Sequence, residues 1–201
     1  MRGVVRLHIA TANPKKVEEL ARLVPEWVEL VPRPSHVGDV DETAPTLEGN
    51  AYIKAVEVAN AVHDWAIADD TGLFVDALGG EPGVHSARYA GPDGDDAANR
   101  AALLQSLGVN PHRSATFRTV VALVHSGGEM HHVTGECTGV IAHEERGEGG
   151  FGYDCLFIPD AGDGRTFAQM TAEEKDEVSH RRRAMDQIPG LLGRIFGSPT
   201  A

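Results

Sequence analysis

The 201-residue chain contains two cysteines, Cys137 and Cys155. Two thiols cannot form the disulfide framework of a small secreted protein, and neither belongs to a paired zinc-binding motif. The adjacent His131 and His132 should point to opposite faces of a strand, and no histidine and cysteine spacing matches a closed tetrahedral site. We therefore predict free thiols that serve in packing, and no zinc site.

Positive charge is also scarce. The chain has 18 Lys and Arg residues against 30 Asp and Glu residues, which gives a net charge of -12 at pH 7. This balance disfavours a broad basic face, so we expect no nucleic-acid partner. The lysines are Lys15, Lys16, Lys54 and Lys175. A lysine ammonium is a compact point charge that suits phosphate oxygens, although a composition biased toward arginine would leave equally few lysines.

Long apolar runs are absent as well. The apolar stretches fall far short of the roughly 20 residues that a membrane helix needs, and the first residues lack the apolar region of a secretory signal. Hydrophobic residues make up 41% of the chain, which is enough to bury a core. We expect a soluble, cytoplasmic protein with one domain over residues 1–201 and no membrane partner.

Apolar periodicity predicts strands that alternate with helices. Strands are expected at 4–10, 65–68 and 153–158, with a β-hairpin in 115–140 that turns at Gly127 and Gly128. Helices are expected at 14–24, at 46–61 with a Thr46 cap, at 95–107 before Gly108, and from a capping box at 171–174 to about 196, interrupted at Pro189 and Gly190. This alternation predicts an α/β fold with a mixed sheet.

Two adjacent carboxylates, Asp69 and Asp70, end an apolar, strand-like run just before Gly72. Side chains alternate along an extended segment, so the two should point to opposite faces, and one of them can face a cleft. That placement suits a hard metal ion. Taken alone, the dipeptide would equally fit a solvated Asx-type turn.

The segment from Thr11 to Lys16 lies between a predicted strand and a predicted helix. Unpaired backbone N–H groups and the helix dipole favour an anion at such a position. Thr11 and Asn13 add short polar groups, and Lys16 adds a mobile positive charge. An ordinary capping role for Asn13 is the alternative.

A glycine-rich segment at 147–152 matches the dinucleotide fingerprint G-x-G-x-x-G. That motif should follow a strand and open a helix, whereas the residues after Gly152 continue as a predicted strand that ends at Pro159. We therefore reject NAD or FAD binding and keep a loop that lets backbone approach a flat ligand.

Five segments form a pattern that extends over most of the chain. They are ATANPKK at 10–16, NAYIKA at 50–55, IADDTG at 67–72 together with the turn-rich 79–91, GFGYD at 150–154 and SHR at 179–181. In this order they resemble the inosine triphosphate pyrophosphatase family, also described as dITP/XTP or non-standard purine NTP pyrophosphatases. The resemblance implies an elongated, mixed, twisted β-sheet flanked by helices, with two lobes and a central active-site cleft.

The resemblance also implies a reaction and a site. ITP, dITP and XTP would be hydrolysed to the monophosphate and pyrophosphate, which cleanses the nucleotide pool of deaminated purines. Mg²⁺ would be held by Glu42 and Asp70, with Asp70 as the catalytic base, a role that Asp69 could share. The implied substrate-binding residues are Thr11, Asn13, Lys16, Lys54, Thr71, Phe151, Gly152, Tyr153, Asp154, Lys175, His180 and Arg181.

Base recognition in this family involves stacking at the position of Phe151. His180 and Arg181 would donate hydrogen bonds to the 6-oxo group, and the same donors would mismatch the amino group of adenine, which would spare ATP. Two positions depart from the family pattern. Gly49 stands where many relatives have an acidic residue, and Arg182 stands where a glycine is common.

Two other functions stay open. One is a broader house-cleaning nucleotide pyrophosphatase that also takes modified pyrimidines, and the other is a non-catalytic nucleotide-binding sensor. Glu42 and Asp70 argue against the sensor, because carboxylates repel a triphosphate unless a metal intervenes. The resemblance further implies a homodimer, with contacts through the helix that carries Asn99.

Overall fold

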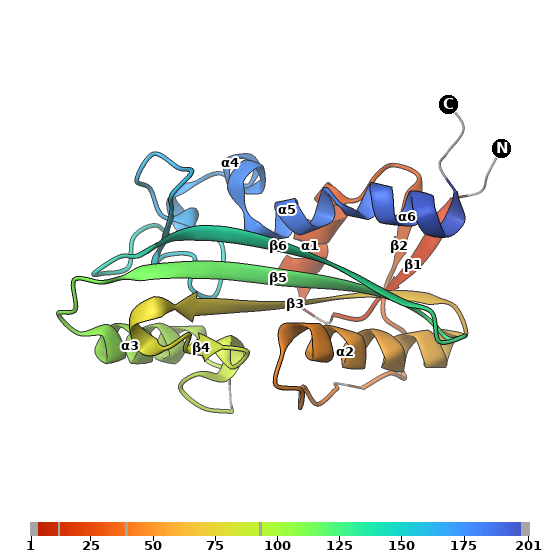
Figure 1. Cartoon of the computed structure of the whole chain (residues 1–201), viewed down its shortest axis with the longest axis horizontal. Coiled ribbons are helices and arrows are strands. Elements are labelled where there is room, and N and C mark those ends of the chain that lie inside the picture. Colours follow the sequence, from red (N-terminus) through yellow and green to blue (C-terminus); the bar gives the residue numbers. More distant parts are fainter. Residues whose placement is uncertain (1–3, 12, 39, 93, 198–201) are drawn as a thin grey trace. The chain divides into compact units, whose positions relative to one another are not determined.

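The computed structural model of the chain describes residues 4–11, 13–38, 40–92 and 94–197. Unit 1 comprises residues 1–70, 120–134 and 183–201, and unit 2 comprises residues 71–119 and 135–182. The division between these compact units runs through β3 (Trp65–Val75), β5 (Ser114–His125), β6 (Met130–Ile141) and α5 (His180–Met185), most of which are long elements in Figure 1. The single domain expected over residues 1–201 stays a prediction.

The strands form a mixed sheet, which confirms the predicted α/β class. Within the described ranges it has seven strands in the order β2-β1-β3-β5-β6-β7, with β4 paired to β3. The remaining strands are β1 (Val5–Ile9), β2 (Val28–Val31), β4 (Pro82–Gly83) and β7 (Phe157–Pro159).

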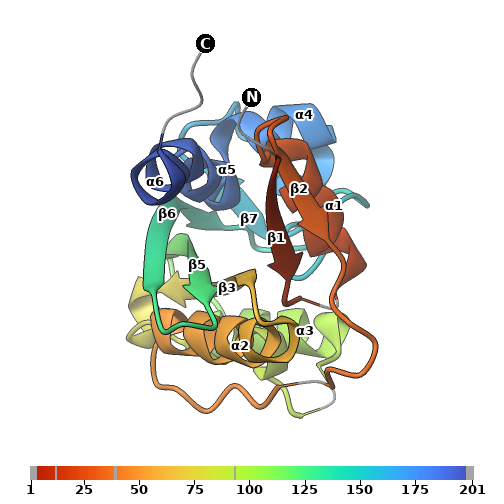
Figure 2. The ribbon, with the colours of Figure 1, turned by 90° about the vertical axis from the view of Figure 1, so that its right-hand side faces the viewer.

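Unit 1 is built on parallel strands. β1 pairs with β2 on one side, where Val5 lies opposite Val28, and with β3 on the other, where Ile9 lies opposite Ile67. Figure 2 shows β1 and β2 side by side. The chain leaves β1 toward β2 through α1 (Pro14–Leu23) and reaches β3 through α2 (Leu47–Val62). Strand order therefore reverses at β1, whose carboxyl end lies beside Ile67 of β3. Open α/β sheets bind ligands at this kind of switch point.

The two connecting helices of unit 1 lie on opposite faces of the strands. Right-handed crossovers in opposite directions require this arrangement. The packing agrees, since Leu20 of α1 joins Leu7, Ile67 and Leu191 in one core, whereas α2 lies below β3 in Figures 1 and 2. The C-terminal α6 (Ile188–Phe196) completes the core on the α1 face.

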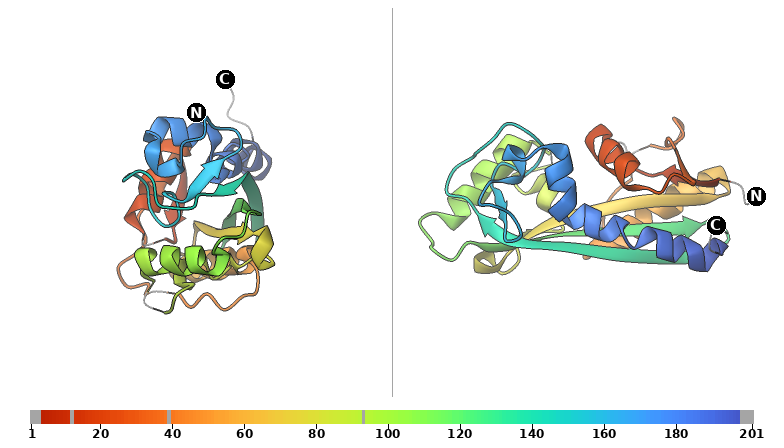
Figure 3. Two further views of the ribbon diagram at one scale, coloured as in Figure 1. Left: turned by 90° about the vertical axis from the view of Figure 1, so that its left-hand side faces the viewer. Right: turned by 90° about the horizontal axis from the view of Figure 1, so that it is seen from above.

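Unit 2 contains antiparallel pairings. β3 pairs with β4, and β6 pairs with β7 so that Gly139 lies opposite Pro159. Its helices α3 (Asp96–Leu107) and α4 (Ala172–Val178) lie on opposite sides of these strands (Figures 1 and 3). Short 3-10 turns occur at Asp76–Leu78, Ser86–Arg88 and Phe167–Gln169. The core is rich in aromatic rings, with Phe117 packed against Phe157.

Helix starts follow the predicted caps. The Thr46 side chain accepts a hydrogen bond from the N–H of Gly49, Asp95 accepts from two N–H groups of α3, and Thr171 forms a capping box with Glu174. Each of these side chains satisfies a backbone donor that the helix itself cannot. The hairpin at Gly127 and Gly128 and the end of α3 at Gly108 are also confirmed.

Three boundaries were predicted wrongly. β3 continues through Asp69 and Asp70 to Val75, because partners on both sides neutralise the carboxylates. The C-terminal helices break at Ser179 and after Met185 rather than at Pro189, which lies in the first turn of α6, where its missing N–H costs nothing. Residues 153–156 form turns, so the strand there is limited to β7. The short β2 was not predicted at all.

Across the described ranges, no helix is both long enough and apolar enough to cross a bilayer. The 16-residue α2 is shorter than the roughly 20 residues that a span requires.

Gly139 offers a test of the β6 and β7 pairing. A Cβ at this position would collide with the carbonyl oxygen of Ile158 and the ring of Phe157. Gly139→Ala should therefore lower the free energy of unfolding by about 2 kcal/mol or more, measured by denaturant titration.

Gly38 is the matched control, because it is exposed and, its chain neighbours aside, no atom of the described part of the chain lies within 4 Å of an added Cβ. Gly38→Ala should stay within about 0.5 kcal/mol of the parent protein. Equal stability of the two variants would contradict the close approach of β7 to Gly139.

Candidate active site

The carboxylates at the centre of β3 face two different helices of unit 1. The Asp69 Oδ2 atom lies 3.2 Å from Nζ of Lys16 on α1, and Asp70 Oδ1 accepts a hydrogen bond of 2.8 Å from Nζ of Lys54 on α2. Asp69 is fully buried, and Asp70 is nearly so. The predicted opposite orientation of the two side chains is confirmed, and each is matched by a lysine from its own face.

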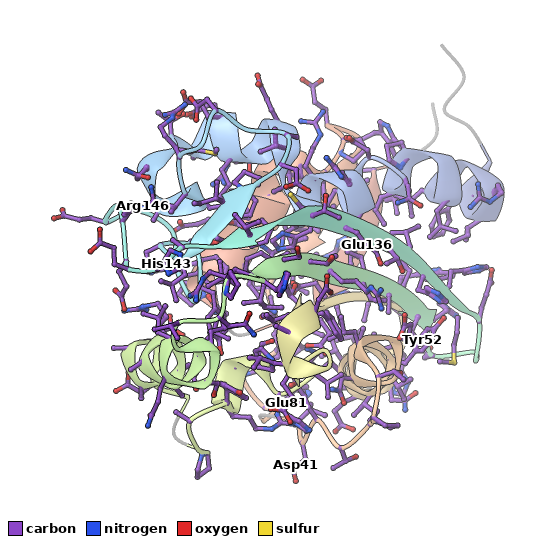
Figure 4. All side chains as sticks on the ribbon, turned by 60° about the vertical axis from the view of Figure 1, so that its left-hand side comes forward. Asp41, Tyr52, Glu81, Glu136, His143 and Arg146 are labelled. Atoms are coloured by element: carbon purple, nitrogen blue, oxygen red, sulfur yellow. The ribbon has the colours of Figure 1, made fainter. Side chains whose placement is uncertain are left out.

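Glu42 joins Asp70 through the same lysine. The Lys54 ammonium donates a 2.7 Å hydrogen bond to Oε1 of Glu42 and a 2.8 Å hydrogen bond to Oδ1 of Asp70. Because both oxygens contact the same nitrogen, the distance between them cannot exceed the sum of these two bond lengths. Asp41, the preceding acid, is exposed and lies on the loop ahead of α2 (Figure 4). The structure thus brings together Glu42, Asp70 and Lys54, which the sequence had grouped only through resemblance.

Burial dominates the electrostatics of this group. Burial raises the pKa of the Asp70 carboxyl above its ordinary value, because it disfavours the charged form. The positive charge of Lys54 lowers this pKa, but the negative charge of Glu42 partly cancels that effect, so the pKa stays raised. Burial alone would lower the pKa of Lys54, but Asp70, Glu42 and Asp69 together raise it. A carboxyl with a raised pKa beside a firmly protonated lysine is suited to accept a proton.

The start of α1 is capped by its own neighbours. The Asn13 side chain accepts hydrogen bonds from the N–H groups of Lys15 and Lys16, at 3.0 and 3.3 Å, and Thr11 Oγ1 accepts from the N–H of Asn13. The capping alternative for Asn13 is therefore correct. Anion binding by Thr11, Asn13 and Lys16 stays a prediction.

A cavity of about 290 Å³ lies beside this loop in unit 1. It is lined by Ile9, Thr11, Val17, Pro32, Arg33, Pro34, Ser35 and Val37. The loop after β2 forms one wall and the start of α1 forms the other. Thr11 therefore borders a recess at the carboxyl end of β1, as expected for a residue near the switch point.

Unit 2 holds a second group around the ring of Phe151. The Lys175 ammonium lies 5.1 Å from the ring centroid, and the Arg181 guanidinium carbon lies 5.9 Å from it. Asp154 accepts a 2.8 Å hydrogen bond from Lys175 and another of 2.8 Å from the N–H of Phe151. Phe151, Asp154, Lys175 and Arg181, all predicted site residues, thus form one cluster of an aromatic ring, two cations and a carboxylate.

His180 and Arg181 are held from the other side. The His180 ring stacks on Phe117 at 4.6 Å with an interplanar angle of 18°. Arg181 Nη2 donates to Thr71 Oγ1 at 3.2 Å, and that hydroxyl is 2.7 Å from the hydroxyl of the fully buried Thr119. These contacts fix both side chains on α5.

Arg182 is exposed on the next position of α5. The arginine at the position where the resemblance implied a glycine is therefore not buried in the cluster around Phe151.

The remaining predicted residues, Gly152 and Tyr153, are tied to the scaffold. The Tyr153 hydroxyl donates to the carbonyl of Ser86 at 2.8 Å, and burial raises its pKa far above the ordinary value. Gly152 is bonded on both of its backbone groups by Asp96 and Arg100 of α3. Sequence reasoning missed Asp96, Arg100 and Thr119, because no local pattern links them to partners that lie 48 to 56 residues away.

Comparisons with known proteins agree with this arrangement. A sequence model described as the Ham1 family matches residues 7–189. The chain belongs to the Ham1 family. A dITP/XTP pyrophosphatase from Desulforamulus reducens is 43% identical over 198 residues, which cover 96% of this chain and 98% of that protein. This relative confirms the resemblance seen in the sequence.

Two solved Ham1 structures match the fold. A HAM1 protein from Coxiella burnetii superposes with a TM-score of 0.86 at 35% identity, covering 94% of this chain and 99% of that one. A nucleoside-triphosphatase, or dITP/XTP pyrophosphatase, from Mycobacterium abscessus gives a TM-score of 0.74 at 46% identity, covering 92% and 98%.

The donor set in this Ham1 protein fits Mg²⁺ better than zinc. In the described part of the chain, no three His, Cys, Asp or Glu side chains are grouped as a metal site. Asp70 Oδ2 is buried and has no hydrogen-bond partner among the described residues, so it can accept a cation. Mg²⁺ keeps several waters and binds through one or two carboxylates together with substrate phosphates, which matches Glu42 and Asp70.

Asn99, which lies on the helix expected to make the dimer contact, is buried within its own chain. Its side chain accepts a hydrogen bond from the N–H of Ala90 at 2.7 Å and donates one to the carbonyl of Ala87 at 3.0 Å. Asn99 therefore shapes the turn beside α3, and any contact with a partner would use other residues of that helix.

Cys155, next to the Phe151 cluster, tests its local packing. Burial raises the pKa of the Cys155 thiol to about 11, while Cys137 is fully buried. At pH 8 the folded protein should react with Ellman's reagent about two orders of magnitude more slowly than the unfolded chain, which exposes both thiols. The rate should rise with pH toward about 11 as the thiolate forms. Rapid labelling of one thiol at pH 8 would contradict this burial.

Proposed function

We propose that this protein is a Mg²⁺-dependent pyrophosphatase that hydrolyses ITP, dITP and XTP to the nucleoside monophosphate and pyrophosphate. The observation that carries the proposal is the pair of carboxylates, Glu42 and Asp70, which Lys54 joins beside the centre of β3. It occurs in a Ham1 chain that is 43% identical, over nearly its full length, to a protein named dITP/XTP pyrophosphatase.

In the proposed reaction, water attacks the α-phosphorus and the bond from that phosphorus to the bridging oxygen breaks. Asp70 orients the water and accepts its proton, in keeping with its raised pKa. Lys16 and Lys54 neutralise charge that develops on the departing pyrophosphate. Mg²⁺, held by Glu42 and Asp70, would supply further neutralisation of phosphate oxygens. The chemistry needs positioning and charge, and no covalent intermediate.

The cluster of unit 2 is assigned to the base. Phe151 supplies an aromatic face, and Lys175 and Arg181 supply donors beside it. A purine with an O6 acceptor satisfies such donors, whereas the amino group of adenine leaves them unmatched and desolvated. Asp154 holds the Lys175 ammonium in place with a 2.8 Å hydrogen bond. This assignment explains how ATP would be spared.

Partners and location follow from the same proposal. The substrate is a small nucleotide, which belongs to the cytoplasmic pool, and a homodimer is proposed on the family resemblance alone. With a net charge of -12, nucleic acid is not proposed as a partner.

The identity of the product tests the reaction. With Mg²⁺ and ITP, the protein should release pyrophosphate and IMP, and no orthophosphate. Asp70→Asn should lose about a hundredfold or more in kcat while its thermal midpoint stays close to that of the parent, because the shape is kept and the base is lost. Asp41→Asn, which changes the exposed neighbour of Glu42, should keep full activity. Release of orthophosphate, or full activity of Asp70→Asn, would overturn the assignment.

Substrate preference separates the remaining alternatives. We expect kcat/KM for ITP and XTP to exceed that for ATP by about a hundredfold or more. Comparable turnover of dUTP would instead indicate the broader house-cleaning enzyme. Tight binding of ITP without any turnover would indicate the sensor.

A further inference from the structure

Helix α3 holds Gly152 by both of its backbone groups. The Gly152 N–H donates to Asp96 Oδ2 at 2.9 Å, and the Gly152 carbonyl accepts from Arg100 Nη1 at 3.2 Å. Asp96 and Arg100 are four residues apart and therefore share one face of the helix. We call this pair the α3 clamp.

The Arg100 side chain is itself fixed. Its Nε donates to Glu145 at 2.9 Å, which leaves Nη1 for Gly152. The guanidinium is a rigid, planar fork, so anchoring one nitrogen sets the direction of the others. Asn99, between the two clamp residues in sequence, binds the turn at Ala87 and Ala90. The helix that carries the clamp is thus secured to a second segment of unit 2.

Gly152 is a position that needs such fixing. Its φ is +57°, in the left-handed region, and an added Cβ would meet no atom within 4 Å among the described residues other than its two chain neighbours. Neither a side chain nor close packing therefore limits its backbone, and glycine has the widest conformational freedom of any residue. Phe151 before it is bonded to Asp154, and Tyr153 after it is bonded to Ser86. Gly152 is the pivot between these two anchored residues.

We propose that Asp96 and Arg100 are positioning residues that hold the Phe151–Gly152 segment in the conformation that receives the base. By setting the direction of the Phe151 ring relative to Lys175 and Arg181, the clamp fixes the affinity for the 6-oxopurine and its discrimination from other bases. The inference rests on the proposed function, and it adds residues on α3 that need not touch the substrate.

The test compares Asp96→Ala with Asp96→Asn. The alanine removes the acceptor for the Gly152 N–H, whereas the asparagine keeps an acceptor oxygen of nearly the same shape. Asp96→Ala should raise KM for ITP about tenfold with kcat within about twofold, and narrow the ratio of kcat/KM between ITP and ATP. Asp96→Asn should restore KM to within about twofold of the parent. Arg100→Ala should act in the same direction as Asp96→Ala.

Asp95→Ala is the matched structural control. Asp95 caps α3 through the N–H groups of Ala97 and Ala98, and among the described residues it makes no hydrogen bond to Gly152. Its loss should therefore lower the thermal midpoint while KM stays unchanged. Hydrogen exchange of the peptide around Gly152 gives a readout without turnover. Exchange there should accelerate in Asp96→Ala and not in Asp95→Ala.

The outcomes separate the two proposals. An inactive parent protein overturns the proposed function and this inference with it. An active parent whose Asp96→Ala variant keeps its KM and base preference overturns the clamp alone, whatever the exchange data show. A similar rise of KM in Asp95→Ala and Asp96→Ala also overturns it, because general loosening of α3 would then be sufficient.

Discussion

The arrangement of the site depends on one buried ammonium group, Nζ of Lys54, which holds Asp70 and Glu42 on either side. Two carboxylates this close repel each other, and each loses hydration on burial, so the pair is stable only with a cation between them. Lys54 comes from the middle of α2, whose start is set by the Thr46 cap and whose packing lies against β3. Small shifts of that helix would therefore separate the charges. The acidic cluster is a product of helix and strand packing, and the loop that carries Glu42 is held to it.

A similar device recurs in unit 2, where Lys175 is buried against Asp154 beside the ring of Phe151. Lys16 against Asp69 is a third instance. Lysine is scarce in this chain, and each of the three lysines that are at least partly buried is paired with a buried aspartate. Two of these aspartates are predicted site residues, and the third, Asp69, is next to one of them in the sequence. Arginine could not replace these lysines easily, because its planar fork needs more room than a compact ammonium group. The site chemistry thus accounts for the lysines that the chain retains. A bias toward arginine accounts for the small number of lysines elsewhere in the sequence.

Local signals were sufficient for the starts of helices and for the opposite faces of Asp69 and Asp70. Caps such as Thr46 and Thr171 act within three residues, and strand alternation has a period of two, so both can be read from a short window. The length of β3 could not be predicted from a short window, because the strand continues through two aspartates only with the help of distant lysines. Asp69 pairs with Lys16 and Asp70 pairs with Lys54. Pro189 misled the prediction of α6 for a different, local reason, because it lies in the first turn of that helix, where its missing N–H costs nothing. The bonds from Asp96 and Arg100 to Gly152 connect segments whose proximity only the tertiary fold decides.

Three consecutive residues of β3 explain why the register of this strand is so constrained. Asp69 pairs with Lys16 of α1, Asp70 with Lys54 of α2, and Thr71 accepts from Arg181 of α5. A slip of one residue would exchange the faces and bring each carboxylate to the wrong helix, leaving buried charges without their cations. No single bond in this set is strong enough to hold the strand, but a slip would break all of them together. Charge pairing in β3 therefore specifies register, as apolar alternation does in an ordinary strand, and the residues proposed for catalysis serve that structural role as well.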